Sequence, residues 1–140
     1  MADPIVIETE PEETEFVYQE KFTEVPLYWQ QDYPKTRYGN YGTVSSHGCG
    51  ITSLAMVLSY LFDEDIMPDE LAAKYGQYNT KVGSSYTLFS ASAADYGIEV
   101  KQVWDWNEVF EALEDGHVVI SNPKTPASLP KEVIISFYTE

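Results

Sequence analysis

The stretch that decides the fold is residues 45–62, which read SSHGCGITSLAMVLSYLF. Within it, apolar side chains recur at steps of three and four residues, which is the spacing of one face of an α-helix. This pattern predicts a helix from Cys49 to Phe62, ended by the charged run at 63–65. Ser45 and Ser46 precede the helix and are expected to supply side-chain oxygens that cap its first turn.

Cys49 is the chemically notable residue of this stretch, because it is the one cysteine of the chain and lies at the first turn of the predicted helix. A thiolate there faces unpaired backbone N–H groups and the positive end of the helix dipole, and both stabilise it as a nucleophile. The neighbouring Gly48 and Gly50 are expected to leave room for a substrate backbone. The alternative interpretation is a buried structural cysteine, because free cysteine is often buried.

Three further helices are predicted downstream. Pro68 in a first-turn position begins the second helix, and Gly76 ends it. Ser84 or Ser85 is expected to cap a third helix, which ends at Gly97. The fourth runs from a capping-box pattern at 105–108 to a glycine stop at 116.

Strands are predicted only in the second half of the chain. Alternating or β-branched residues favour short strands at 98–101, 117–121 and 132–138, and the proline-rich segment 122–131 between the last two favours a loop. Because helices come first and strands gather late, the predicted class is α+β rather than alternating α/β.

The first 48 residues divide into two parts. Residues 1–24 contain eight acidic side chains against a single lysine and are expected to be a flexible acidic leader or linker without the pattern of a signal peptide. Residues 25–48 are rich in Tyr, Gly, Pro and Asn, which favours extended chain and turns over helix. The folded domain is therefore expected to span 25–140.

The composition excludes several classes of function. The chain has 140 residues with 23 acidic and 8 basic side chains, for a net charge of −15. Both nucleic-acid binding and binding to an anionic membrane surface need a basic patch, so neither is expected. One cysteine leaves no internal disulfide and no cysteine-built zinc site, so we expect no metal and no cofactor. No apolar run of about 18 residues predicts a transmembrane helix.

Several segments together resemble the bacterial C-39-like cysteine peptidases, relatives of the bacteriocin-leader peptidases. The most specific segment surrounds Cys49 and follows the pattern Ser-x-Gly-Cys-Gly-Pro-Thr-Ser-Leu-Ala-Met-Val, except that Ile51 replaces the proline. The resemblance covers residues 25 to about 122 and is carried by QQDY at 30–33, YG at 38–39, SSHGCGITSLAMVL at 45–58, MPDE at 67–70, GSS at 83–85 and LEDGHVVI at 113–120.

The resemblance implies a papain-like (cysteine proteinase) α+β fold, with helices followed by a small antiparallel sheet, and a thiol mechanism on peptides or proteins. Cys49 would be the nucleophile, and Gln30, with Gln31 as the alternative, would donate an N–H to the oxyanion together with the Cys49 backbone. It also implies an extracellular or cell-surface location.

The histidine that the family uses as acid and base is not found at its expected place. The register of the apolar run at 131–135 puts Glu132 there, and an ionised carboxylate is a poor donor to a leaving amine. His47 is more simply a turn residue, and His117 more simply complements the end of the preceding helix. We therefore expect weak or absent peptidase activity and incomplete C-terminal strands.

Three hypotheses stay open at the sequence level. One is a cysteine peptidase whose histidine is lost or supplied otherwise, one is a non-catalytic peptide-binding or surface-interaction module, and one is a domain whose final strands are changed by truncation or frameshift. An aromatic set could line a peptide groove, although packing over the core is favoured: Tyr28, Trp29, Tyr33, Tyr38 and Tyr41.

Overall fold

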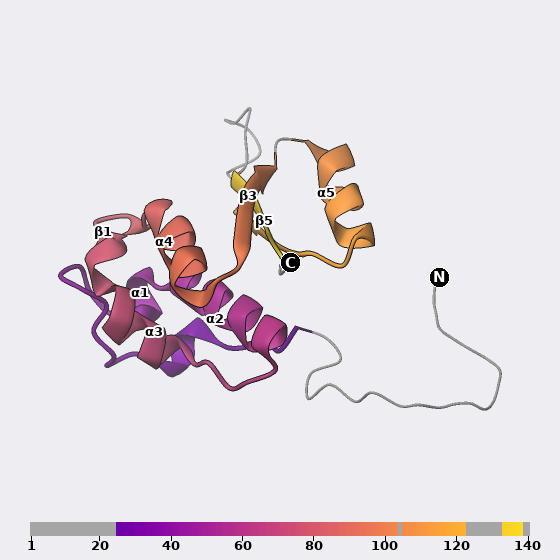
Figure 1. Cartoon of the computed structure of the whole chain (residues 1–140). Helices are drawn as coiled ribbons and strands as arrows, with labels where there is room; N and C mark the ends of the chain where they lie inside the picture. Colours follow the sequence, from indigo (N-terminus) through magenta and orange to yellow (C-terminus); the bar gives the residue numbers. More distant parts are fainter. Residues whose placement is uncertain (1–24, 104, 123–132, 139–140) are drawn as a thin grey trace, which may run out of the picture.

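A computed structural model describes residues 25–103, 105–122 and 133–138 of the chain (Figure 1). In chain order the elements are η1 (Gln30–Asp32), α1 (Val44–His47), α2 (Cys49–Phe62), α3 (Pro68–Tyr75), η2 (Gly76–Tyr78), β1 (Asn79–Thr80), β2 (Gly83–Ser84), α4 (Thr87–Tyr96), β3 (Glu99–Val103), α5 (Trp106–Glu114), β4 (Val118–Asn122) and β5 (Val133–Tyr138). This is the predicted α+β class, with helices first and most of the strands late.

Helix α2 lies at the centre of the helical part of the molecule. Its predicted apolar face is confirmed, since Ile51, Leu54 and Leu58 are fully buried. Leu71 of α3 and Leu88 of α4 are buried in the same core. The first residue of α2 is therefore fixed by a helix that is packed along most of its length.

The late strands form one antiparallel sheet in the order β3-β5-β4. Val118 pairs with Phe137 in the register, and both side chains are buried in the core that the helices build. The ring of Phe137 meets Phe89 of α4 edge-on, with centroids 6.0 Å apart. Val119, the next residue of β4, packs instead with Val109 of α5. Because neighbouring side chains of a strand point to opposite faces, the sheet lies between the main helical layer and α5 (Figure 1).

The predicted helix ends agree with the structure in three helices and fail in one. Helices α2 and α3 have the predicted limits, and Asp105 accepts a hydrogen bond from the backbone N–H of Glu108 at 2.9 Å to cap α5. The predicted serine cap of α4 is wrong, because that helix begins at Thr87 without a side-chain cap. Ser84 is instead a residue of β2, and its hydroxyl is hydrogen-bonded to that of Tyr38.

The segment before Cys49 holds more helix than predicted. Ser45 and Ser46 do not cap α2; both belong to the short helix α1. Thr43 caps α1, since its hydroxyl accepts from the Ser46 N–H at 3.2 Å while the Ser46 hydroxyl accepts from the Thr43 N–H at 3.0 Å. The prediction failed because Ser and Thr favour caps in general and four residues are too few to show a helical period.

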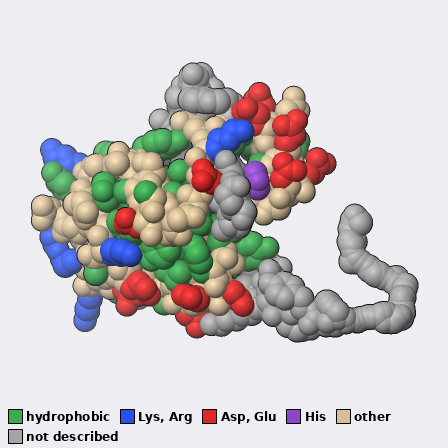
Figure 2. Space-filling view, in the orientation of Figure 1, with side chains coloured by type: hydrophobic (Ala, Val, Ile, Leu, Met, Phe, Trp, Pro, Cys, Tyr) green, Lys and Arg blue, Asp and Glu red, His purple; other side chains and the backbone are tan. Residues whose placement is uncertain are grey.

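Charge is distributed unevenly over the surface. On the face in Figure 2, acidic side chains gather over α5 and along the lower edge of the helical part. In the described ranges no helix combines the length and apolar character needed to cross a membrane. The predicted acidic leader at 1–24 and Glu132 both lie outside the described residues.

Candidate functional site

An open cavity of about 200 Å³ lies beside Cys49. It joins the first two turns of α2 to the segment around η1, which is about twenty residues earlier in the sequence. Cys49 is exposed, so the alternative of a buried structural cysteine is wrong. The side chains that line the cavity are Leu27, Tyr28, Trp29, Gln30, Gln31, Cys49, Thr52, Ser53 and Met56.

Cys49 is the first residue of α2, as predicted. Gly48 is the N-cap, and no side chain there accepts a hydrogen bond from the first turn. The first N–H groups of a helix have no partner within the helix, so the start of α2 has partial positive charge next to Cys49. The position is that of an accessible thiol at a positively polarised helix end.

The two glycines around Cys49 have a different role from the predicted one. A Cβ atom on Gly48 would lie 2.5 Å from the carbonyl oxygen of Val44, and a Cβ atom on Gly50 would lie 2.8 Å from the Cβ and Oγ of Ser84. Both contacts are closer than real Cβ atoms tolerate. The glycines therefore allow α1 and β2 to pack against the start of α2, and the prediction that they leave room for a substrate is wrong.

Gln30 is half-buried in η1 and is held in place by α1. Its Nε2 donates a hydrogen bond to the carbonyl oxygen of Ser45 at 2.9 Å. An amide nitrogen carries two N–H groups, so this bond orients Gln30 and leaves a second donor. Gln31 lines the same cavity with an exposed side chain.

Neither histidine lines the Cys49 cavity. The Nε2 of His47 donates to the carbonyl oxygen of Lys81 at 3.0 Å, and its Nδ1 lies 2.7 Å from the Ser46 hydroxyl. Because a carbonyl can only accept, Nε2 has a proton, and the Ser46 hydroxyl is the partner of Nδ1. His47 thus ties α1 to the turn between β1 and β2.

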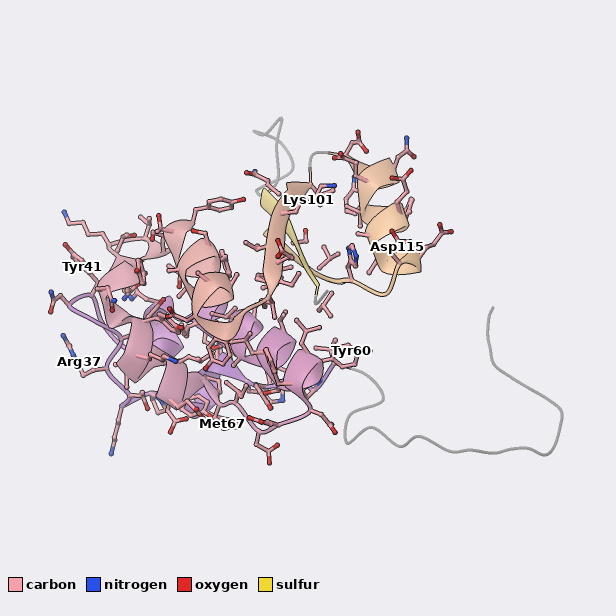
Figure 3. All side chains as sticks on the ribbon, viewed as in Figure 1. Arg37, Tyr41, Tyr60, Met67, Lys101 and Asp115 are labelled. Atoms are coloured by element: carbon pink, nitrogen blue, oxygen red, sulfur yellow. The ribbon has the colours of Figure 1, made fainter. Side chains whose placement is uncertain are left out.

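His117 lines a second, separate cavity of about 120 Å³ between β3 and α5. Lys101 and Asp115 lie on its two sides (Figure 3). The backbone N–H of His117 donates to the carbonyl of Ala112 at 2.9 Å and so closes the end of α5. This bond comes from the backbone, so the role predicted for the His117 side chain at the end of that helix stays a prediction.

Two buried residues near Cys49 add to the site: Thr52 was not predicted as a site residue, and Tyr38 was predicted only as a member of the aromatic set. Thr52 is buried, and within the part of the chain that the structure describes its Oγ1 has no hydrogen-bond partner. Tyr38 is fully buried, and its hydroxyl meets Ser84 beside Gly50. Burial raises the pKa of the Tyr38 phenol, the hydrogen bond with Ser84 lowers it, and negative charge on Cys49 raises it. The helical period placed Thr52 next to the nucleophile, but it could not show that its hydroxyl lacks a partner.

The aromatic set divides between the cavity and the core. Tyr28 and Trp29 line the cavity, and for these two side chains the peptide-groove role stays a prediction. Tyr38 is in the core and Tyr33 packs against it, as the packing interpretation expected. Tyr41 is exposed and lies, like Arg37, on the side of the molecule opposite α5 in Figure 3.

Comparison with known proteins gives one match. The model of the Peptidase_C39 like family matches residues 22–138, which includes α2, the cavity segment and all three strands of the sheet. Searches of curated proteins and of solved structures returned no match. The matched range covers most of the chain and includes Cys49, and the family is related to cysteine peptidases. The chain belongs to the Peptidase_C39 like family.

Proposed function

We propose that this domain binds a peptide over the Cys49 cavity, and that Cys49 attacks a carbonyl of that peptide in a thiol-peptidase reaction with slow turnover. The proposal rests on the observation that Cys49 and Gln30 line the same open cavity at the start of α2. Membership of the Peptidase_C39 like family supports it.

The chemistry follows from the two groups. The Cys49 sulfur forms a bond to the carbonyl carbon, and the oxyanion accepts hydrogen bonds from the second N–H of Gln30 and the Cys49 backbone N–H. The C–N bond then breaks, the amine leaves with the proton lost by the thiol, and an acyl thioester remains. Water hydrolyses the thioester, which releases the acid and restores the thiol.

The slow step is expected to be the departure of the amine. An amine leaves readily only when an acid protonates it, and among the described residues no histidine lines the cavity. His47 is held by the Ser46 hydroxyl and the Lys81 carbonyl instead.

A substrate with a better leaving group separates the attack by Cys49 from the departure of the leaving group. A p-nitrophenyl ester needs no proton on its leaving group, so the proposal expects rapid release of one equivalent of p-nitrophenol per chain and slow release afterwards. Intact mass should then show one acyl group on Cys49. Quenched fluorescent peptides should be cleaved far more slowly, and Cys49→Ala should abolish both reactions. An ester burst that survives in Cys49→Ala would contradict the proposal.

The second candidate is a peptide-binding module without catalysis. The same absence of a histidine from the cavity lining favours it. It expects peptide binding that survives Cys49→Ala, with no peptide cleavage and no acylation by the ester. Isothermal titration of the Cys49→Ala variant with peptides, beside the ester assay on the unchanged chain, distinguishes the two candidates.

A further inference from the structure

Acidic and basic residues are absent from the described lining of the Cys49 cavity although the protein is strongly acidic. The chain has a net charge of −15, yet none of the described residues that line the cavity is an Asp, Glu, Lys or Arg. A site for a lysine or arginine side chain would use the carboxylates that this chain has in excess. Among the described residues the cavity thus offers a charged side chain no ionic partner, and burying a charge without a partner is costly.

The cavity has an apolar wall that faces solvent. Leu27 is 67% exposed and Trp29 is 59% exposed, while Met56 of α2 lines the same cavity from the helix. Methionine and tryptophan beside each other offer a large and adaptable apolar contact. An apolar side chain that entered would remove this surface from water.

Hydrogen bonds to α1 and α2 fix the position of the segment that forms this wall. The Tyr28 hydroxyl donates to the Ser59 hydroxyl at 2.8 Å, which ties the segment to α2, and the Gln30 amide ties it to Ser45 at 2.9 Å. The N–H of Asp32 donates to the carbonyl of Trp29 at 3.1 Å and closes the turn of η1 that contains Gln30. The cavity is thus built by the fold and needs no ligand to form.

Thr52 supplies a second observation. The residue lines the cavity, and its Oγ1 is buried without a hydrogen-bond partner among the described residues, whereas buried hydroxyls are nearly always paired. A rotation of the Thr52 side chain toward the cavity would let this hydroxyl pair with an N–H or C=O group of a bound peptide.

We infer that the cavity is a specificity subsite for a large, uncharged apolar side chain of a peptide, of the phenylalanine or leucine kind. The volume of about 200 Å³ agrees with this size, because a cavity of about 150 Å³ accommodates a benzene ring. The subsite rests on the proposed function, since that function makes the ligand a peptide held against Cys49.

Protection of Cys49 from alkylation tests the subsite without requiring catalysis. Tripeptides acetyl-Gly-X-Gly-amide, with Phe, Leu, Ala, Lys or Glu at X, are added to the full chain with iodoacetamide. Because Cys49 is the one cysteine, intact mass gives its alkylation rate directly. The Phe and Leu peptides should halve this rate at about tenfold lower concentration than the others, the factor expected for burying one large apolar side chain.

Two tryptophan variants provide a matched pair. Trp29→Ala should remove the preference for Phe and Leu, whereas Trp106→Ala, an equally exposed tryptophan of α5 outside the cavity, should keep it. Equal protection by all five peptides, stronger protection by Lys or Glu, or no protection by any peptide would overturn the subsite.

The protection experiment and the activity assays test the subsite and the proposed function separately. Selective protection without acylation or cleavage would leave the subsite standing and reject the thiol-peptidase reaction. Acylation and cleavage that ignore the residue at X would do the opposite.

Discussion

At the scale of single residues, the structure separates two glutamines that the sequence leaves as alternatives. Both line the cavity, but Gln30 is half-buried and oriented by the Ser45 carbonyl, whereas Gln31 is exposed. A preorganised donor stabilises an oxyanion better than one that must first be ordered, because its orientation is fixed before the reaction. Gln30 is thus the stronger candidate for the oxyanion donor.

Gln30→Ala should therefore slow acylation of Cys49 by a p-nitrophenyl ester by about 100-fold, the effect of losing one oxyanion donor. Gln31→Ala is the matched control and should change the rate by less than threefold. Stopped-flow measurement of p-nitrophenol release gives both rates. If Gln31→Ala had the larger effect, the assignment of the two residues would be reversed.

Removal of two buried hydroxyls of α2 should change the free energy of unfolding in opposite directions. Thr52→Val should raise the free energy of unfolding by about 1 kcal/mol, because it removes a buried hydroxyl that has no partner in the described residues. Ser59→Ala should lower it by about 1–3 kcal/mol, because that hydroxyl donates to the Ile66 carbonyl and accepts from the Ile66 N–H and from Tyr28. Urea unfolding measures both, and a destabilised Thr52→Val variant would show that the hydroxyl is paired.

At the scale of elements, the sequence predicted a helix correctly where the residues that indicate it lie within that helix. The apolar period, the first-turn proline and the aspartate cap define α2, α3 and α5 within the elements themselves. It failed for α1, for the start of α4 and for the hairpin of β1 and β2, because these short elements are fixed by contacts between distant segments. The cavity has the same origin, since η1 reaches α2 only in the folded chain.

Gly50 and Ser84 give a test of one such distant contact. Gly50→Ala should destabilise the fold, because its Cβ would lie 2.8 Å from Ser84 at the junction of α2 and β2. In the Ser84→Gly background the same change should cost less, which gives a coupling free energy of about 1 kcal/mol in a double-mutant cycle. Additive effects in thermal or urea unfolding would mean that the backbone relaxes without contact between the two positions.

At the scale of the whole molecule, the sheet and the helices share one core on one side, and α5 covers the other side. The predicted class and the order of helices and strands follow from the sequence. The placing of the sheet between two helical layers does not, because only the folded chain shows that Val118 faces the main core and Val119 faces α5. The expected peptidase family is confirmed, and the match reaches residue 138, beyond the segment near 122 where the resemblance ended.

Buried tyrosines make the fold sensitive to alkaline pH. Burial raises the pKa of Tyr75 and of Tyr38, and for Tyr75 the hydrogen bond to Asp95 at 2.8 Å and the charge of Asp95 raise it further. Below pH of about 10 the folded and unfolded chains both keep these protons. Above it the unfolded chain releases protons that the folded chain retains, so the free energy of unfolding falls as the pH rises.

Tyr75→Phe should make this alkaline loss of stability shallower, because phenylalanine has no proton to lose. At pH 7 the variant should be less stable by about 1 kcal/mol, since its hydrogen bond to Asp95 is absent. Urea unfolding at pH 8, 10 and 11 gives the slope for each chain. Tyr41→Phe, at the exposed end of the helical part, is the control and should keep the slope of the unchanged chain. An unchanged slope in Tyr75→Phe would assign the alkaline sensitivity to Tyr38 or to general charge repulsion.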